Sequence, residues 1–357
     1  MIRRIFKIDL LLFLPAIFLS GFGLLMIYSI SFDSDPSIFA RQLVYFLISV
    51  FIFFLISSLD FKVISHLWPL WYILVVGILL LTFIVGVETR GSVRWLDFGV
   101  FKIQGSEIAK PILLLTLATF FAKYPLEKLR NFLISIFLLS LPLIFVFSQP
   151  DLGSALILVV IWISLVFIAG ANLLHFAATA LIALATAPIL WNFLKGYQRE
   201  RVLSFLNPNI DPLGSNYSVA QALIALGSGE LTGRGLGRGT QSQLNFLPEE
   251  GTDFIFAATG EELGFIGIFL LIVIFAFLIF RLLKTAQTSK NLGASLFIFG
   301  AASILFSQFV INAGMNMGVI PVTGITLPFV SFGGSSIISM FILLGLVESA
   351  RRSNQGV

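Results

Sequence analysis

Long apolar runs separated by short polar connections extend along almost the whole chain. Runs of about 20 apolar residues predict membrane-spanning α-helices, because backbone exposed to lipid must satisfy its own hydrogen bonds. The alternating pattern typical of a membrane β-barrel is absent. The pattern predicts an all-α polytopic membrane protein, one domain over residues 1–357. The ten predicted spans are Leu10–Ile30, Arg41–Ser58, Trp68–Val87, Glu107–Ala122, Phe132–Ser148, Leu152–Gly170, Leu173–Leu194, Gly260–Arg281, Leu292–Asn312 and Leu327–Glu348.

Composition supports this prediction. The chain is 58% hydrophobic and 11% charged, whereas a soluble domain has about 25% charged residues. Arg3, Arg4 and Lys7 precede the first apolar run, as in a signal peptide. That run is too long for a signal peptide and no clear cleavage site follows, so we interpret it as a retained first span.

The distribution of Lys and Arg between the loops predicts the orientation. One set of loops carries twelve, which are Arg3, Arg4, Lys7, Lys62, Lys123, Lys128, Arg130, Arg281, Lys284, Lys290, Arg351 and Arg352. The opposite short loops carry four, which are Arg41, Arg90, Arg94 and Lys102. This bias places both termini in the cytoplasm. The loops Glu88–Ser106 and Lys195–Gly251 are then outside.

The long outer loop, residues 195–251, has distinct parts. Tyr217–Leu226 is predicted to form a short helix lying at the membrane interface. Gly227–Gly239 reads GSGELTGRGLGRG and lacks the lysine of a phosphate-binding loop. It is interpreted either as a flexible hinge or as backbone that approaches a ligand closely, with Arg234 and Arg238 reaching an anion.

Several kinds of chemistry are excluded. The chain has no cysteine and only two histidines, His66 and His175, placed in separate short connections. Thiol catalysis, disulfides and a Cys/His metal cluster are therefore ruled out. The net charge of +4 reflects loop bias and forms no basic stripe, so nucleic acid is not an expected partner.

Acidic residues gather between Gly239 and Gly264, where the sequence is GTQSQLNFLPEEGTDFIFAATGEELG. Thr252 and Asp253 are typical of a helix start, with a hydroxyl cap followed by an acid. Glu249 and Glu250 come just before this start, and the interpretation leaves the two later glutamates, Glu261 and Glu262, unexplained. Acids at membrane depth are costly and mark a pathway, a site or an ion pair.

A second group of polar residues precedes or follows the outer ends of predicted spans. Glu107 and Lys110 are three residues apart and can pair on one helix face, either as a structural ion pair or as a lysine held for a phosphate. Arg90 and Arg94 suit either interfacial anchoring or a diphosphate. Asp151 lies in a tight outer turn. Together these groups suit a substrate with a diphosphate head and a lipid tail, without distinguishing chemistry from transport.

Four long motifs, in order, resemble the SEDS family (shape, elongation, division, sporulation). They are RGSVRWLDFGVFKIQGSEIAK, SQPDLGSALI, the acidic stretch from Gly239 to Gly264, and NAGMNMGVIPVTGITLPFVSFGGSS. The resemblance covers nearly the whole chain. GTQSQLNFLPE is most similar to the RodA group, which acts in cell elongation.

The resemblance implies a peptidoglycan glycosyltransferase of the bacterial cytoplasmic membrane that polymerises lipid II outside the cell. It also implies a class B penicillin-binding protein and other elongation-complex membrane proteins as partners. Asp253 matches the family's essential aspartate, and Glu107 and Lys110 match its fourth-span pair. Arg90, Arg94, Asp151, Arg201, Arg238 and Gln241 are further candidates for substrate binding, with Glu249, Glu250 and Glu261 as supporting acids. Gly105 and Gly251 depart from the family pattern, which usually has Pro and His there.

Our hypothesis is that Asp253 acts as a general base. The sequence leaves open whether a divalent cation assists the acids. Two alternatives remain: a flippase for the same lipid-linked precursor, and a non-catalytic scaffold of the elongation complex. A flippase requires polar groups along both leaflets, whereas a scaffold does not require Asp253.

The predicted orientation is tested by labelling. Because the chain has no native cysteine, a single cysteine at Ser215 reports its own position. A membrane-impermeant maleimide is expected to label this variant in intact cells. Labelling that needs permeabilised membranes would place the long loop on the cytoplasmic side.

Overall fold

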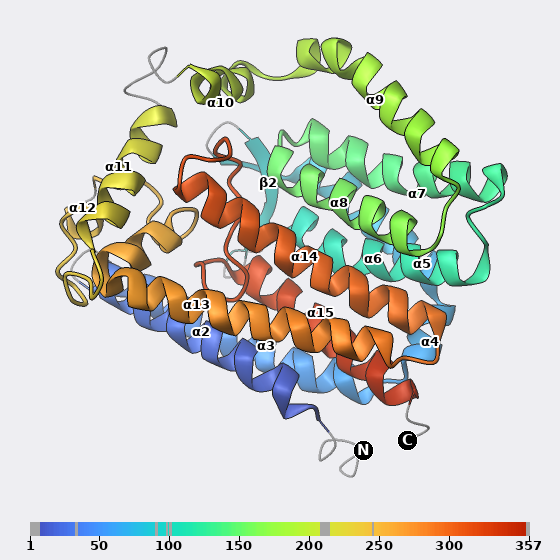
Figure 1. Cartoon of the computed structure of the whole chain (residues 1–357), viewed down its shortest axis with the longest axis horizontal. Helices are drawn as coiled ribbons and strands as arrows, with labels where there is room; N and C mark the ends of the chain where they lie inside the picture. Colours follow the sequence, from blue (N-terminus) through green and yellow to red (C-terminus); the bar gives the residue numbers. More distant parts are fainter. Residues whose placement is uncertain are drawn as a thin grey trace.

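The protein is a bundle of helices with a small sheet at one end (Figure 1). The computed structural model describes residues 8–32, 35–89, 92–97, 99, 102–207, 215–244 and 246–354. The elements are α2 Leu10–Ser31, α3 Ser37–Ser58, α4 Phe61–His66, α5 Trp68–Val85, β1 Val87–Thr89, β2 Ser92–Asp97, β3 Lys102–Gln104, α6 Gly105–Lys123, α7 Leu129–Ser148, α8 Leu152–Ile168, α9 Leu173–Phe193, α10 Gly196–Leu206, α11 Ser215–Ser228, α12 Thr240–Gln243, α13 Ile255–Gln287, α14 Leu292–Asn316 and α15 Gly334–Asn354.

Each of the ten predicted spans coincides with one apolar helix. Among the described residues, eight helices are long and apolar enough to cross a membrane, and α8 and α9 are shorter apolar helices. The boundaries of two spans were wrong. α13 begins at Ile255 rather than Gly260, and α15 begins at Gly334 rather than Leu327. The second error arises because residues 317–333 contain prolines and glycines and follow an irregular path.

The helices differ in how deeply they are buried. α6 and α15 are the most buried candidate spans and form the centre of the core together with α14. By contrast, none of the described side chains of α9 is fully buried, and α9 arches away over α7 and α8 (Figure 1). Both chain ends lie at the same end of the bundle, as an even number of spans requires.

A three-stranded antiparallel sheet, which the sequence analysis missed, precedes α6. The strand order is β1-β2-β3, with Trp95 opposite Gln104 and Asp97 opposite Lys102. The strands are short, and their pattern was hidden inside a polar loop. The sheet holds Arg94 next to the turn that precedes α8.

The glycine-rich run after α11 packs against a kink in α13. Gly264 has φ 66° and ψ −162°, a conformation that only glycine adopts readily. The amides of Phe265 and Ile266 donate to the carbonyls of Glu230 and Leu231 at 2.9 and 3.1 Å. The glycine run therefore approaches α13 closely, whereas the approach to a ligand and the flexible hinge both stay predictions. The predicted helix Tyr217–Leu226 is confirmed as α11, which packs on α13.

Gly264→Ala is expected to destabilise the fold strongly. A Cβ at this position would overlap the amide nitrogen of Gly233, and the backbone strain alone costs about 1–3 kcal/mol. Thermal melting of the purified protein measures the loss. Gly227→Ala is the matched control, since a Cβ there meets no atom within 4 Å. Equal melting temperatures for the two variants would contradict the packing role of the kink.

Candidate active site

Asp253 lies in the turn before α13, and its backbone is fixed from two sides. The amide groups of Asn312 and Asn316 in α14 each donate to the Asp253 carbonyl at 3.0 Å. Ser331 Oγ donates to the carbonyl of Thr252 at 2.6 Å. The Asp253 side chain is half-buried. The predicted capping role of Thr252 is wrong, because its hydroxyl donates to the Glu249 carboxylate at 3.1 Å.

The irregular segment 317–333 connects Asp253 with the turn at Asp151. A Cβ built on Gly324 would lie 3.6 Å from Asp253 Oδ2. A Cβ on Gly153 would lie 2.7 Å from the carbonyl oxygen of Thr323. Asp253 and the start of α8 therefore both contact the short stretch from Thr323 to Ile325. Sequence alone gave no indication that this stretch joins them.

Asp151 is a buried hydrogen-bond acceptor. Its Oδ2 accepts from Gln104 Nε2 at 3.0 Å and Ser106 Oγ at 2.9 Å, and its Oδ1 accepts from the Ser154 amide at 3.1 Å. Burial by itself raises the pKa of this carboxyl, but the charge of Arg94 and the bonds from Ser154 outweigh it and hold the pKa below its usual value. Asp151 thus ties the start of α6 to the start of α8.

Glu107 and Lys110 form the predicted pair, and both are buried. Lys110 Nζ lies 2.6 Å from Glu107 Oε1, and the exposed fractions of the two side chains are 2% and 7%. The backbone carbonyl of Glu107 accepts from Ser339 in α15 at 2.6 Å. Glu107 Oε2 has no hydrogen-bond partner among the described residues. The ammonium is covered, so its contact with a substrate phosphate stays a prediction.

Two arginines connect the sheet, α10 and the irregular segment. Arg94 donates to the carbonyls of Gln149 and Pro150 and to the Tyr197 hydroxyl. Arg201 lies over the Tyr197 ring and donates to the Val322 carbonyl at 3.3 Å. Some of the N–H donors of both guanidinium groups are therefore already bonded to backbone carbonyls. Arg90 lies outside the described residues.

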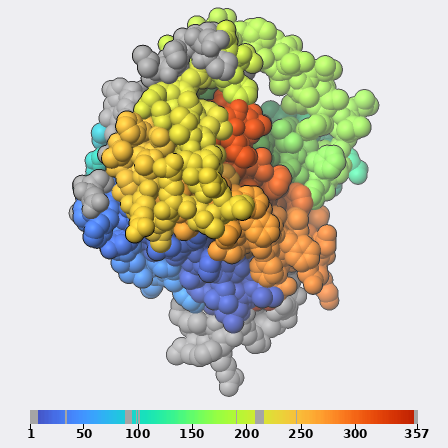
Figure 2. Space-filling view, turned by 60° about the vertical axis from the view of Figure 1, so that its left-hand side comes forward, coloured from blue at the N-terminus to red at the C-terminus, as the bar shows by residue number. Residues whose placement is uncertain are grey.

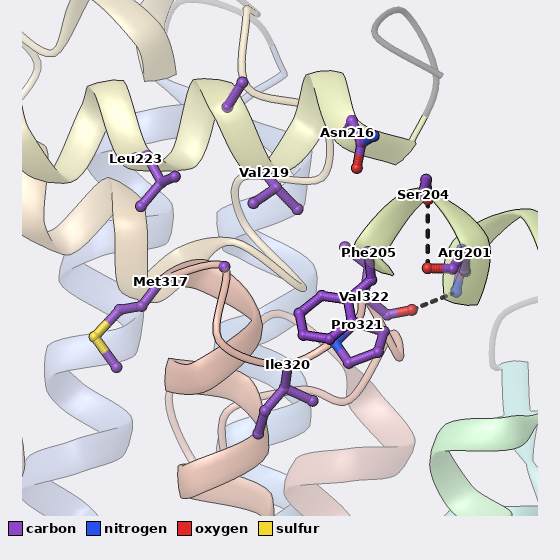
Figure 3. A pocket seen from close by; sticks show the side chains of 12 residues that line it. Arg201, Ser204, Phe205, Asn216, Val219, Leu223, Met317, Ile320, Pro321 and Val322 are labelled. Atoms are coloured by element: carbon purple, nitrogen blue, oxygen red, sulfur yellow. Dashed lines mark hydrogen bonds between the residues drawn. The ribbon is translucent and has the colours of Figure 1, made fainter. Parts of the chain in front are cut away.

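A cavity of about 350 Å³ opens beside Arg201. Figure 3 shows that α10, α11 and the segment after α14 surround it. Its lining is mostly apolar, and includes Phe205, Leu223, Met317 and Pro321. In Figure 2 the yellow surface of α11 and α12 and the green α9 flank the orange-red segment. The cavity lies next to Val322, two residues before the glycine that contacts Asp253.

The acids of the long motif have different environments. Glu261 is fully buried and accepts from the amides of Gln241 and Ser242 at 2.8 and 3.0 Å, at the start of α12. Its other bonds come from the hydroxyls of Thr240 and Ser242. Because these donors occupy both oxygens, Glu261 anchors α12. Arg238 is exposed on the surface.

Comparison with known proteins identifies the family to which the chain belongs. The family model described as "Cell cycle protein" (FtsW, RodA and SpoVE) matches residues 9–356. Peptidoglycan glycosyltransferase MrdB of Escherichia coli strain K12 is 36% identical, covering 92% of this chain and 89% of MrdB. The chain belongs to this family. A probable peptidoglycan glycosyltransferase FtsW of Wigglesworthia glossinidia brevipalpis is 37% identical over 97% of this chain and 94% of that protein.

Solved structures agree with this SEDS assignment. The structure described as "Structural coordination of polymerization and crosslinking by a peptidoglycan synthase complex" has a TM-score of 0.83 at 30% identity. Thermus thermophilus RodA has a TM-score of 0.74 at 28% identity. Each comparison covers 98% of both chains. The relatives include both FtsW and MrdB, so they do not separate a division role from an elongation role.

Within this SEDS fold, the structure gathers most of the predicted site residues. Asp253, Arg201 and the start of α8 contact the segment 317–333, and the charges of Arg94 and of Lys110, the partner of Glu107, act on Asp151 at the start of α8. Glu249, Glu250, Glu261 and Gln241 lie towards α12 and α13. Sequence reasoning missed Tyr197, Asn312, Asn316 and Ser331. The four-residue spacing of the two asparagines, which puts them on one helix face, was the available signal. In the described part of the chain, no group of three His, Asp or Glu side chains is placed to hold a metal ion.

The pKa of Glu250 is raised well above the usual value for a carboxyl group. Burial, followed by the charges of Glu261, Glu262 and Glu249, raises its pKa from 4.5 to about 8. Its Oε2 is buried without a hydrogen-bond partner in the described structure. The folded protein therefore holds a proton that the unfolded chain releases. The contribution of Glu250 to the free energy of unfolding is fully present below about pH 4.5, and it is lost as the pH rises towards 8.

Glu250→Gln is expected to remove part of this pH dependence. Between about pH 5 and about pH 9, the melting temperature should fall less for the variant than for the natural chain, because glutamine has no proton to lose. Glu127→Gln, which replaces an exposed acid, is the control and should follow the natural chain. If the melting temperature depends on pH in the same way for all three proteins, the raised pKa of Glu250 is contradicted.

Proposed function

We propose that this SEDS protein, a peptidoglycan glycosyltransferase, polymerises lipid II at the outer face of the bacterial cytoplasmic membrane during cell elongation. A class B penicillin-binding protein and other membrane proteins of the elongation complex are the proposed partners. The names of the relatives and the complex that polymerises and crosslinks peptidoglycan support this function. The RodA-like stretch GTQSQLNFLPE supports the elongation role. Both termini are proposed to be cytoplasmic.

The placement of Asp253 carries the proposal. Its backbone is fixed by two asparagines, yet its half-buried carboxylate lies at the mouth of α13 beside the segment that also contacts the Asp151 turn. A fixed carboxylate at the entrance of a site is what a general base requires.

In the proposed reaction, Asp253 takes the proton from the 4-hydroxyl of the acceptor sugar. The hydroxyl oxygen then forms a bond to the anomeric carbon of the donor, and the bond from that carbon to the lipid diphosphate breaks. Positive groups stabilise the charge that grows on the departing diphosphate. Lys110, Arg94 and Arg201 are the candidates for this role, since Arg201 contacts the same segment as Asp253 and the charges of Arg94 and Lys110 act on Asp151 at the neighbouring turn.

The distribution of polar groups favours synthesis over transport. The candidate residues gather at one end of the spans, whereas a flippase requires a polar path through both leaflets. The core of the bundle is a continuous cluster of apolar side chains from α2, α6, α8, α13, α14 and α15. A scaffold gives no reason to hold an aspartate at the mouth of a helix with two buried asparagines.

Asp253→Asn is expected to lower polymerisation by about 10²- to 10⁴-fold, because the amide cannot accept the proton. Folding should be retained, since Asn312 and Asn316 bond to the backbone carbonyl of residue 253 and not to its side chain. Glycan synthesis by purified protein with lipid II measures the effect, and thermal melting checks the fold.

The matched control is Asp97→Asn, which removes an exposed acid of the outer sheet and should leave synthesis unchanged. Near-normal synthesis by Asp253→Asn would refute the base assignment. Absence of polymer from the natural chain, with precursor movement across vesicles, would favour the flippase.

The buried pair needs a different test. Lys110→Ala or Glu107→Ala leaves one charge buried without its partner, which costs about 3–5 kcal/mol and obscures any catalytic effect. Glu107→Gln combined with Lys110→Met removes both charges, so the fold should recover most of its stability. If Lys110 contacts the diphosphate, this folded double variant is expected to bind and polymerise lipid II poorly. Normal polymerisation by the double variant would show that the pair is structural only.

A further inference from the structure

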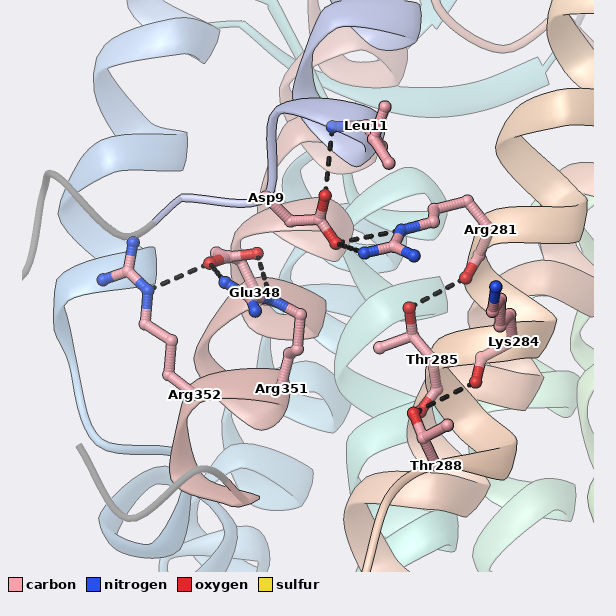
Figure 4. Close-up of polar contacts among 9 residues, drawn as sticks. All are labelled: Asp9, Leu11, Arg281, Lys284, Thr285, Thr288, Glu348, Arg351 and Arg352. Atoms are coloured by element: carbon pink, nitrogen blue, oxygen red, sulfur yellow. Dashed lines mark hydrogen bonds and ion pairs between the residues drawn. The ribbon is translucent and has the colours of Figure 1, made fainter.

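A second group of charged side chains lies at the opposite end of α13 from Asp253. Asp253 precedes the first residue of this helix, whereas Arg281 and Lys284 lie near its last. This end of the bundle also holds both chain termini (Figure 1). Figure 4 shows the group, whose charged members are Asp9, Arg281, Lys284, Glu348, Arg351 and Arg352.

An ion pair joins α2 to α13 in this group, two further pairs lie within α15, and the charge of Asp9 also acts on Arg351 of α15. Arg281 Nε donates to Asp9 Oδ2 at 3.0 Å, and Asp9 Oδ1 caps the start of α2 through the amide of Leu11. Glu348, whose side chain is 1% exposed, accepts from Arg351 at 2.7 Å and from Arg352 at 2.9 Å. The cluster therefore connects α2, α13 and α15 at one membrane boundary.

The positive charge of the cluster exceeds the negative charge. Two arginines share the single carboxylate of Glu348, and Lys284 is exposed without an ion pair among the described residues. Four cations against two carboxylates leave a surplus of two positive charges. Arg352 is only 7% exposed, and its Nη2 has no hydrogen-bond partner in the described structure. Excess positive charge at a membrane surface attracts anionic lipid.

The positive-inside bias and the helix dipoles explain the sign of this cluster, because cations at the C-terminal ends of α13 and α15 are favourable there. Beside the cluster, α2 and α13 expose apolar side chains, as lipid-facing helices do. Leu10 and Leu14 of α2 are 58% and 55% exposed, and Phe280 of α13 is 63% exposed. α2 and α13 pack against each other, so this surface adjoins the charged group.

We propose that this end of the bundle binds an anionic glycerophospholipid, with its phosphate at Arg281, Lys284 and Arg351 and its acyl chains along α2 and α13. Arg281 and Arg351 keep 26% and 14% of their side chains exposed, and Lys284 is exposed. Because Arg281 and Arg351 already donate Nε and Nη2 to carboxylates, they attract the phosphate through their positive charge, together with the exposed ammonium group of Lys284. A lipid bound there bridges α13 and α15, so binding stabilises the folded protein by mass action. The inference does not depend on the proposed reaction.

The test measures the thermal melting of delipidated protein in a neutral detergent, titrated with phosphatidylglycerol. Phosphatidylcholine and inorganic phosphate are the parallel titrants. Phosphatidylglycerol is expected to raise the melting temperature saturably, and the other two are not. Lys284→Gln is expected to weaken phosphatidylglycerol binding by about fivefold, the effect of one cation near a lipid surface. Lys284→Gln combined with Arg351→Gln is expected to weaken it further.

Lys128→Gln is the matched control, because it removes an exposed lysine before α7, outside the cluster. It should bind phosphatidylglycerol as the natural chain does. Equal weakening by Lys128→Gln and Lys284→Gln would overturn the site in favour of a diffuse surface charge. Equal stabilisation by inorganic phosphate would assign the cluster to a soluble anion and overturn the lipid. No response to phosphatidylglycerol would overturn binding altogether.

Discussion

Hydrogen bonds to non-helical backbone, in the turn before α13 and in the segment between α14 and α15, are the constraint on which the candidate site depends. Backbone in a membrane protein needs internal partners wherever water is excluded. Asn312 and Asn316 bond to the Asp253 carbonyl, and Asn312 also bonds to the carbonyl of Ile325 at 2.8 Å. Gln42 in α3 accepts from the Gly333 amide at 3.1 Å. Side-chain amides thus replace the helical bonds that this segment lacks.

This arrangement lets an irregular segment lie against helices without losing its shape. The stretch from Thr323 to Ile325 contacts Gly153 at the start of α8 and approaches the Asp253 carboxylate through Gly324. Gly153 is required because a Cβ there would lie 2.7 Å from the Thr323 carbonyl oxygen, whereas Gly324 is favoured by its positive φ of 72°. The site is consequently built from helix ends and one fixed segment, and its shape follows from the packing of α6, α8, α13 and α14.

Buried charge serves two different purposes in the bundle. Glu261 holds α12 and Asp151 holds the start of α6, each through several donors that compensate for the loss of water. Glu250 has no such donors on its buried oxygen, and neighbouring acids oppose its ionisation. Acids that are neighbours in the sequence therefore differ in the structure, because Glu261 is held by several hydrogen-bond donors and Glu250 is not.

The sequence by itself determined the membrane class, the apolar helices and the family, and it supplied the candidate site residues. Hydrophobic length and long motifs carry that information locally, and neither depends on which helices touch. Only the tertiary structure decided that Glu107 and Lys110 are covered, that Arg94 and Arg201 bond to backbone carbonyls, and that glycines after α11 dock on a kink in α13. These outcomes depend on contacts between residues far apart in the chain, such as Arg201 and Val322 or Glu230 and Phe265. Burial and hydrogen-bond partners arise from packing, which a one-dimensional pattern does not specify.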